Sequence, residues 1–113
     1  DNAVAVSNRL DLIKQHIDPH LPDRSLSVEG IARHHKVTAR TVQKLFEAEG
    51  TTFSEHVLER RLNAAWDRLR AQDGRADKIS DIAYEVGFGD LSYFNRAFRR
   101  RFGMTPRQAR LQT

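Results

Sequence analysis

Residues 81–106 read DIAYEVGFGDLSYFNRAFRRRFGMTP and predict two short helices that meet at a tight turn. The apolar spacing of the first helix ends near Val86, and Gly87 supplies a position at which the backbone can take a positive φ. Asp90 then offers a carboxylate that can accept a hydrogen bond from the first turn of the next helix. This order of helix, glycine turn and capped helix indicates a helix-turn-helix.

The second of these helices, expected at about residues 91–102, has separate apolar and polar sides. Phe94 and Phe98 lie one helical turn apart, so we expect both rings in the core. Their burial turns four polar side chains outward: Ser92, Asn95, Arg96 and Arg99. Side chains of these types can hydrogen-bond to the bases and phosphates that line a DNA groove.

The positive charge of the chain is concentrated at its C-terminal end. The net charge is +4 over 113 residues, yet residues 91–113 contain six arginines and no acidic residue. The rest of the chain therefore has a net charge of −2, the difference between +4 and +6. This asymmetry favours a polyanionic partner. The competing interpretation is a solvated arginine-rich tail.

Length and composition exclude several classes of protein. With 113 residues and 39% hydrophobic content, the chain can bury one modest core or two small ones. No apolar run approaches the roughly 20 residues that span a bilayer, and the first residues do not have the pattern of a signal peptide, so we expect a cytoplasmic protein without a membrane partner. The absence of cysteine excludes disulfides, thiolate nucleophiles and cysteine-ligated zinc.

The first half of the chain predicts a similar pair of helices. Val6, Leu10, Ile13 and Ile17 have helical spacing, and Pro19 ends this first helix. A second helix is expected after a cap at Ser27, and residues 34–37 are expected to form a turn. Thr38 can cap a third helix at about residues 39–49, with a buried face formed by Val42, Leu45 and Phe46.

The two helix pairs repeat each other weakly in sequence. Ile31-Ala32 matches Ile82-Ala83 at an offset of 51 residues. The caps Thr38 and Asp90, and the apolar pairs Val42 with Phe94 and Phe46 with Phe98, match at an offset of 52. A duplicated supersecondary unit explains this better than a solenoid, because stacked arrays usually need about three repeats.

A longer helix is expected between the two pairs. Thr52 and Glu55 have the spacing of a capping box, and an apolar stripe follows: Val57, Leu58, Leu62, Ala65, Trp66 and Leu69. A polar loop at residues 72–77 leads into the second pair. We therefore expect three parts, with a helix-turn-helix subdomain at residues 1–51, a linker helix at 52–72 and a second helix-turn-helix subdomain at 73–113.

The chain resembles the DNA-binding domain of the AraC/XylS family of bacterial transcription regulators. The resemblance extends from about Asn8 to Arg110, and its specific part is a set of fixed spacings: Ile82-Ala83, Gly87-Phe88, Ser92-Tyr93-Phe94, Arg96, Phe98, Phe102-Gly103 and Thr105-Pro106. It implies an all-α fold of about seven helices, with two helix-turn-helix units and a linker helix. It also implies that the third and sixth helices enter adjacent major-groove segments of double-stranded DNA.

The resemblance implies specific DNA contacts. The side chains that it places at base edges are Arg40, Gln43 and Lys44 of the third helix and Ser92, Asn95 and Arg96 of the sixth, with Leu91 nearby. Arginine and lysine can donate to guanine, and glutamine and asparagine can pair with adenine. The expected contacts to the DNA backbone are Thr38, Thr41, Asp90, Tyr93, Arg99 and Arg100.

Further partners follow from the same resemblance. It implies contact with RNA polymerase at a promoter, more often to activate than to repress transcription. It also implies an effector-sensing or dimerisation domain before Asp1, and the absence of an initiator methionine agrees with that expectation. No cofactor, metal ligand set or catalytic residue is expected.

One segment departs from the family pattern. The third helix ends with Glu47-Ala48-Glu49, where many relatives have basic residues, whereas the matching part of the sixth helix reads Arg99-Arg100-Arg101. Acidic side chains near phosphates repel them. We therefore expect the second unit to be the stronger electrostatic anchor.

Four other interpretations of the sequence compete with specific DNA binding. The chain could be a nonspecific nucleic-acid binder or a protein-interaction module, since fold does not fix function. The aromatic residues could stack on single-stranded bases, but their helical spacing favours the core. A nuclease could use four acidic residues: Asp73, Asp77, Asp81 and Glu85.

Histidines give little support for a metal site in the sequence. His16 and His20 have the four-residue spacing of a helical metal pair, but Pro19 lies between them and no third ligand is evident. His34 and His35 fall in the predicted turn and His56 in the linker helix. We expect all five to be surface or hydrogen-bonded histidines, with His34 and His35 near DNA as the alternative.

Overall fold

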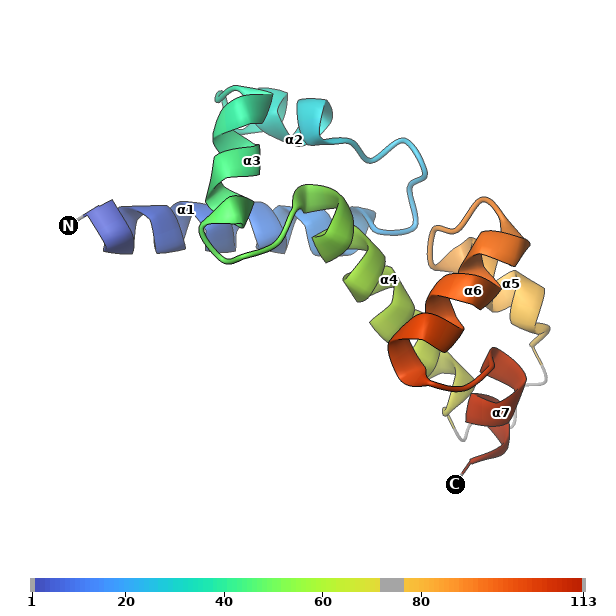
Figure 1. Cartoon of the computed structure of the whole chain (residues 1–113). Helices are drawn as coiled ribbons and strands as arrows, with labels where there is room; N and C mark the ends of the chain where they lie inside the picture. The colour runs from blue at the N-terminus through green and yellow to red at the C-terminus, as the bar shows by residue number, and fades with distance from the viewer. Residues whose placement is uncertain (1, 72–76, 113) are drawn as a thin grey trace. The chain divides into compact units, whose positions relative to one another are not determined.

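The computed structural model describes residues 2–71 and 77–112, and the side chains of residues 8–71 and 77–112. Within these ranges every regular element is a helix (Figure 1), which confirms the expected all-α fold with seven α-helices. The expected polar loop at residues 72–77 lies outside the described residues, except for Asp77, and so does the side chain of Val6. None of the described helices is long and apolar enough to cross a bilayer.

The α-helices alternate with short connections. Their bounds are α1 Asn2–Ile17, α2 Val28–His34, α3 Ala39–Glu47, α4 Phe53–Leu69, α5 Ile79–Glu85, α6 Leu91–Phe102 and α7 Pro106–Leu111. A short 3₁₀ helix, η1 Asp18–His20, follows α1 and contains Pro19, so α1 ends just before the proline as predicted. Helix α3 ends at Glu47, two residues earlier than expected, because residues 48–50 form a turn.

The chain divides into two compact units, residues 1–58 and 59–113. The division falls inside α4, so this helix supplies residues to both units. The predicted partition into residues 1–51, 52–72 and 73–113 stays a prediction. Each unit contains one helix-turn-helix, formed by α2 and α3 in the first unit and by α5 and α6 in the second.

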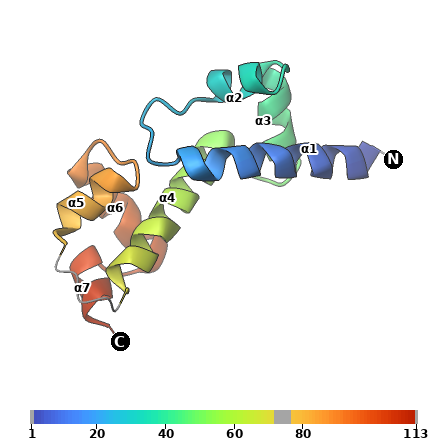
Figure 2. The same ribbon diagram turned by 180° about the vertical axis from the view of Figure 1, so that it is seen from behind.

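The first unit packs α1 against both helices of its helix-turn-helix. The pair formed by α2 and α3 lies beside α1 in both views (Figures 1 and 2). Its core is apolar and contains Leu10, Ile13, Ile17, Leu21, Ile31, Ala32, Val42, Leu45, Phe46, Phe53 and Val57. Phe46, Val42 and Ile13 have no exposed surface, so the apolar spacing seen in the sequence correctly identified this face.

The second unit is built around aromatic side chains. Phe94 and Phe98 of α6 are completely buried, as predicted, with ring centroids 5.6 Å apart. The indole of Trp66 in α4 stacks on Phe102 at 4.5 Å. Helix α6 also contacts α5 and α7 (Figure 2). The rings pack on one another in the interior, which leaves Phe94 and Phe98 with no surface on which a base could stack.

Side-chain caps fix where the helices begin. Ser27, Thr38 and Asp90 each accept a hydrogen bond from the backbone of the first turn, at the starts of α2, α3 and α6. These three caps confirm the predictions. Thr105 caps α7 in the same way and forms a full capping box with Gln108. Each such cap satisfies a backbone N–H that has no partner inside the helix.

The start of α4 combines two hydrogen bonds around Glu55. Its N–H donates to the hydroxyl oxygen of Thr52 at 3.0 Å, which is one half of the predicted capping box. Its carboxylate accepts from the hydroxyl of Thr51 at 3.1 Å. The helix therefore begins at Phe53, directly after the two threonines.

Two backbone hydrogen bonds close the turn of the first helix-turn-helix. The N–H of Lys36 donates to the carbonyl of Arg33 at 3.2 Å, and the N–H of Val37 donates to the carbonyl of Ala32 at 3.0 Å. These bonds cap the last carbonyls of α2 and reverse the chain toward α3. Lys36 has a φ of 58°, in the left-handed region.

The turn of the second helix-turn-helix has the same pair of bonds, 51 residues later. The N–H of Gly87 donates to Tyr84 at 3.1 Å, and the N–H of Phe88 donates to Ala83 at 3.0 Å. Gly87 takes the place of Lys36, with a φ of 114°. The weak repeat seen in the sequence is therefore a repeat of backbone hydrogen bonding.

The repeat extends to the helix before each pair. Three buried positions of α1 match three buried positions of α4 at an offset of 52 residues: Leu10 with Leu62, Ile13 with Ala65, and Ile17 with Leu69. Each unit thus has a supporting helix followed by a helix-turn-helix.

Replacing Gly87 with alanine tests the backbone constraint in the second turn. A φ of 114° is strongly unfavourable for an L-residue, so we expect Gly87→Ala to lower the free energy of unfolding by at least about 1–2 kcal/mol. The matched control is Lys36→Ala, which keeps an L-residue at φ 58° and should change stability by less than about 0.5 kcal/mol. Urea unfolding of both variants measures the difference. Equal effects would show that φ does not limit the second turn.

Candidate nucleic-acid interface

The outward side of α6 carries the polar residues predicted for base contacts. Ser92, Asn95 and Arg96 are exposed, whereas Phe94 and Phe98 on the opposite side are buried. Arg96 is one helical turn after Ser92, so the two lie on neighbouring parts of one surface. The amphipathic phase of the helix therefore presents donors and acceptors outward, where a duplex can reach them.

A groove of about 690 Å³ runs along this side of the second unit. Its lining comes from three helices and the residue before α7: Ile79 and Ser80 of α5, Leu91, Asn95, Arg96 and Arg99 of α6, and Thr105, Pro106 and Arg107. Asn95, Arg96 and Arg99 thus share one concave surface with the beginnings of α5 and α7, whereas Ser92, Tyr93 and Arg100 are exposed outside its lining. Three arginines give this surface a positive charge.

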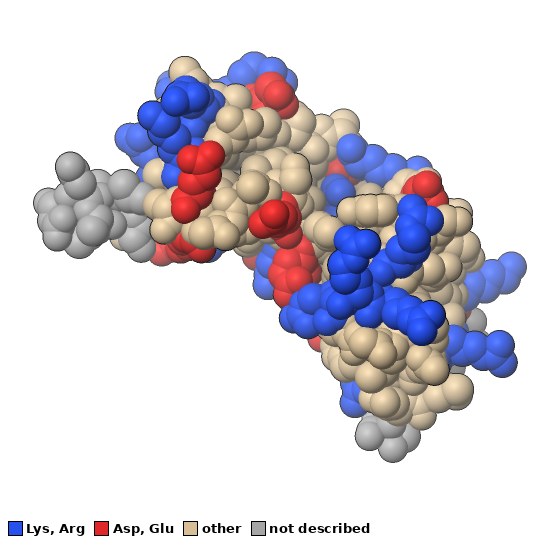
Figure 3. All heavy atoms as spheres, in the orientation of Figure 1, with Lys and Arg blue, Asp and Glu red and all other residues tan. Residues whose placement is uncertain are grey.

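The three consecutive arginines of α6 have different surroundings. Arg99 lines the groove and Arg100 is exposed. Arg101 instead donates from Nε to the carboxylate of Glu59 in α4 at 2.8 Å, and its guanidinium lies 4.7 Å from the centre of the Phe102 ring. In Figure 3, basic side chains gather over α6. Arg101 contributes to the internal contacts of the unit, whereas Arg99 and Arg100 are exposed on its surface.

The corresponding helix of the first unit is α3, and its outward side is also polar. Arg40, Gln43 and Lys44 are exposed. Val42 and Phe46 face the core with no exposed surface. The helix therefore presents the three predicted base-contacting residues away from the core.

A smaller groove of about 280 Å³ lies along this side of the first unit. It is lined by Val28, Gln43, Glu47, Thr52, Phe53 and Ser54. Every one of these positions matches a lining position of the larger groove at offsets of 51 to 53 residues: Ile79, Asn95, Arg99, Thr105, Pro106 and Arg107. The duplicated units have thus formed the same groove twice.

The two grooves differ in charge. Glu47 stands where the second groove has Arg99, and Ser54 stands where it has Arg107. Glu49, the other acid of this segment, is held by Lys14 of α1 at 2.6 Å. Glu47 and Ser54 therefore both contribute to the charge difference between the groove linings, and a phosphate would meet less attraction in the first groove than in the second.

The predicted backbone-contacting residues at the helix starts take part in capping. The hydroxyl oxygen of Thr38 accepts from the N–H of Thr41 at 3.1 Å, and the carboxylate of Asp90 accepts from the N–H of Tyr93 at 3.1 Å. Tyr93 is 45% exposed, and its ring centroid lies 6.3 Å from that of Phe88. The Tyr93 hydroxyl is therefore carried on a ring that is only partly buried.

The acidic residues proposed for a nuclease do not form a described cluster. Asp73 lies outside the described residues. Arg68 forms ion pairs with both Glu85 and Asp77, and its distance to Asp77 is 3.9 Å. Asp81 and Glu85 are exposed on α5. Among the described residues, the grouping that could hold a metal ion is formed by histidines, at His16, His34 and His35.

Sequence reasoning missed the contribution of α7 to the groove. The groove beside the polar side of α6 is also lined by Thr105, Pro106 and Arg107. These residues follow the end of α6, so the chain has to turn back to bring them there. The signal available in the sequence was the capped helix start at Thr105-Pro106 and the arginine after it. The position of that start beside Asn95 follows only from how α7 packs on α6.

Two capped helix-turn-helix units, each with a groove beside the polar side of its second helix, define a double helix-turn-helix DNA-binding domain. Residues 31–112 match the sequence model of the family described as Helix-turn-helix domain. The chain belongs to the AraC-type branch of this family. It is therefore a DNA-binding domain of the kind that regulates transcription.

Named relatives agree with this assignment. Transcriptional activator RhrA of Rhizobium meliloti (strain 1021) is 48% identical over 103 residues, which cover 91% of this chain and 32% of RhrA. Transcriptional activator NphR of Rhodococcus sp is 37% identical over 97 residues, covering 86% of this chain and 28% of NphR. The chain thus spans about a third of the length of these relatives.

A solved structure shares the fold over nearly the whole chain. It is a transcriptional regulator from Chromobacterium violaceum, described among AraC-type DNA-binding domain-containing proteins, with a TM-score of 0.86 and 28% identity. The match covers 96% of this chain and 95% of that one.

Proposed function

We propose that this chain reads a specific site on double-stranded DNA by placing α3 and α6 in the major groove, as part of a bacterial transcription activator. The observation that carries the proposal is the repeated groove, which presents polar side chains of α3 and α6 in equivalent positions. Because the two units repeat within one chain, one copy offers two reading helices without dimer symmetry.

Helix α6 supplies the stronger set of contacts in this proposal. Arg96 can donate to guanine O6 and N7, and the amide of Asn95 can pair with adenine. Ser92, nearer the start of the helix, can donate to or accept from either base type. All three side chains are exposed, and Asn95 and Arg96 line the groove.

Helix α3 supplies the second set of base contacts. Arg40 and Lys44 can bind guanine, and Gln43 can bind adenine. Gln43 lines the smaller groove, where Asn95 stands in the larger one. We therefore assign Gln43 and Asn95 equivalent roles in the two halves of the DNA site.

Contacts to the DNA backbone position these helices. We assign phosphate contacts to Arg99, Arg100 and the hydroxyl of Tyr93, and add Arg107, which lines the same groove as Arg99. At the helix starts, the contacts come from the regions capped by Thr38 and Asp90. The Asp90 carboxylate is already bonded to a backbone N–H, so a phosphate would bind neighbouring N–H groups and not the carboxylate. Thr41 lies in the first turn of α3, where its hydroxyl is hydrogen-bonded to the hydroxyl of Thr38 at 2.9 Å, and we assign it a contact to the DNA backbone beside that cap.

We also propose the setting in which the domain works. The relatives RhrA and NphR are named transcriptional activators, and we infer that this chain activates transcription through contact with RNA polymerase at a promoter. An effector-sensing or dimerisation domain before Asp1 would complete the regulator. Its place of action is the cytoplasm, where the bacterial chromosome lies.

Two other functions compete with specific readout. A nonspecific nucleic-acid binder needs positive charge, but it needs no particular polar side chains at the helix positions that would face the DNA major groove. A protein-interaction module would favour apolar side chains at those positions. Arg40, Gln43, Asn95 and Arg96 at those positions favour base readout. Cleavage of plasmid DNA in the presence of Mg²⁺ would reveal a nuclease.

The proposal is tested by selecting binding sites from a randomised duplex library. The selected duplex and a scrambled control are then titrated at two salt concentrations. Specific readout predicts two short sequence blocks about one helical turn apart and much tighter binding to the selected duplex. Binding that depends only on salt, with no enriched sequence, would contradict the proposal.

Arg96→Ala distinguishes a base contact from a phosphate contact. We expect a loss on the order of 1 to 3 kcal/mol in binding the selected duplex and a relaxed preference at one base position. The matched control is Arg100→Ala, which should weaken binding to the selected and scrambled duplexes alike. Titration of both duplexes with both variants provides the measurement. A uniform loss for Arg96→Ala would reassign that residue to the DNA backbone.

Glu47→Arg tests whether the first groove faces DNA. The change copies Arg99 into the equivalent position, so the chain should bind DNA more tightly. One added phosphate contact should also make the slope of log K against log salt concentration steeper by roughly 0.9. Glu49→Arg adds the same charge two residues away, outside the groove lining. It should have a smaller effect. Equal effects of the two changes would indicate attraction by net charge alone.

A further inference from the structure

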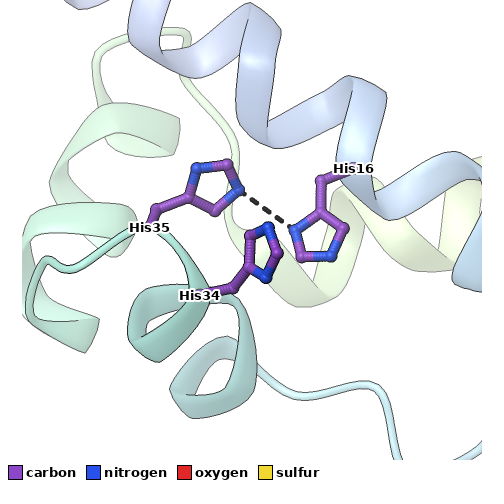
Figure 4. A group of neighbouring side chains, drawn as sticks. All are labelled: His16, His34 and His35. Atoms are coloured by element: carbon purple, nitrogen blue, oxygen red, sulfur yellow. Dashed lines mark hydrogen bonds between the residues drawn. The ribbon is translucent and has the colours of Figure 1, made fainter.

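Three histidines from two parts of the first unit meet in one cluster (Figure 4). His16 lies near the end of α1, His34 ends α2, and His35 is the next residue, at the start of the turn. Nδ1 of His16 and Nε2 of His35 are hydrogen-bonded at 3.1 Å. The ring centroids of His16 and His34 are 4.1 Å apart.

The geometry of this cluster fits a metal ion. One ring nitrogen from each of the three histidines lies within 4.8 Å of the other two. Two nitrogens bound to a tetrahedral zinc ion are about 3.3 Å apart, given bonds of about 2.0–2.1 Å. The pair formed by His16 and His35 already has nearly this separation. His34 is exposed, so its ring is free to turn the remaining distance.

The lowered pKa values of His16 and His35 add to the geometric argument for metal binding. Burial lowers the pKa of His16, and the nearby His34, His35 and His20 lower it further. Burial and His34 lower the pKa of His35. Only a neutral imidazole has a lone pair for a metal. One of the two facing nitrogens, Nδ1 of His16 or Nε2 of His35, carries the hydrogen atom of their hydrogen bond. That hydrogen can move to the other nitrogen of the same ring. Both facing nitrogens then have a lone pair for the metal, and the net charge is unchanged.

We propose that His16, His34 and His35 form a binding site for a divalent transition-metal ion, with Zn²⁺ as the best-suited ion. Three imidazoles without carboxylates suit zinc, copper and nickel, whereas magnesium and calcium prefer oxygen ligands. A fourth position is left for water or another ligand, as in zinc sites with three protein ligands. The three residues are separate from the linings of both grooves.

The location gives such an ion a structural effect on the first helix-turn-helix. His16 belongs to the supporting helix α1, whereas His34 and His35 lead directly into Lys36, the residue with positive φ. An ion bound to all three joins α1 to the turn that orients α3. It therefore stabilises the folded first unit, because the unfolded chain does not hold the three ligands together.

Metal titrations of the chain, expressed without a histidine tag, test the site. Co²⁺ serves as a spectroscopic substitute for zinc, since a tetrahedral cobalt site absorbs in the visible range. Zn²⁺ is then added in competition and by calorimetry. We expect one ion per chain, displacement of Co²⁺ by Zn²⁺, and a rise in Tm on the order of 10 °C at zinc about 100-fold above Kd.

The variants His34→Gln and His35→Gln remove one ligand each, and His20→Gln is the matched control. His20 is close to His16, but its Nδ1 donates to the backbone carbonyl of that residue. His34 is exposed, so its replacement should leave the fold intact, which a melting curve without metal verifies. We expect both ligand variants to lose the cobalt absorption and the zinc-induced rise in Tm, and His20→Gln to keep them. Absence of cobalt absorption in the unaltered chain, unchanged binding in His34→Gln, or equal losses in His20→Gln and His34→Gln would overturn the proposal.

Discussion

In each helix-turn-helix, a backbone hydrogen bond between residues five positions apart closes the turn. The rest of the structure depends on this constraint. Val37 bonds back to Ala32 in the first unit, and Phe88 bonds back to Ala83 in the second, both at 3.0 Å. This bond satisfies a carbonyl at the end of one helix and sets the direction of the next. The buried apolar side of α3 or α6 can then reach the supporting helix, and its polar side must point outward.

The two units show that one backbone arrangement can carry different surface charge. The hydrogen bonds of the turns, the buried positions of the supporting helices and the groove-lining positions all repeat. At the equivalent groove positions, however, the first unit has Glu47 and the second has Arg99. Shape depends on the buried residues, which resist change because interiors are close-packed. Exposed residues are free to differ, so the units can share a fold and differ in how strongly they attract phosphates.

Internal contacts also decide which charged residues remain available to a partner. Arg101 bonds to Glu59 and lies over the Phe102 ring, whereas its neighbour Arg100 extends from the surface. Glu49 is held by Lys14, whereas Glu47 lines a groove. A run of like residues in the sequence therefore divides into residues that form contacts within the unit and residues that remain exposed on its surface.

The sequence by itself determined the two helix-turn-helix pairs, their caps at Ser27, Thr38 and Asp90 and the polar side of each second helix, because helical periodicity and capping depend on residues three or four positions apart. It thus predicted that Asn95 and Arg96 point outward and that Phe94 and Phe98 are buried. Only the tertiary structure decided that Arg107 shares a groove with Arg99, and that His16 lies beside His35. These arrangements bring together residues of different helices, and they depend on how whole helices pack, which no local pattern specifies.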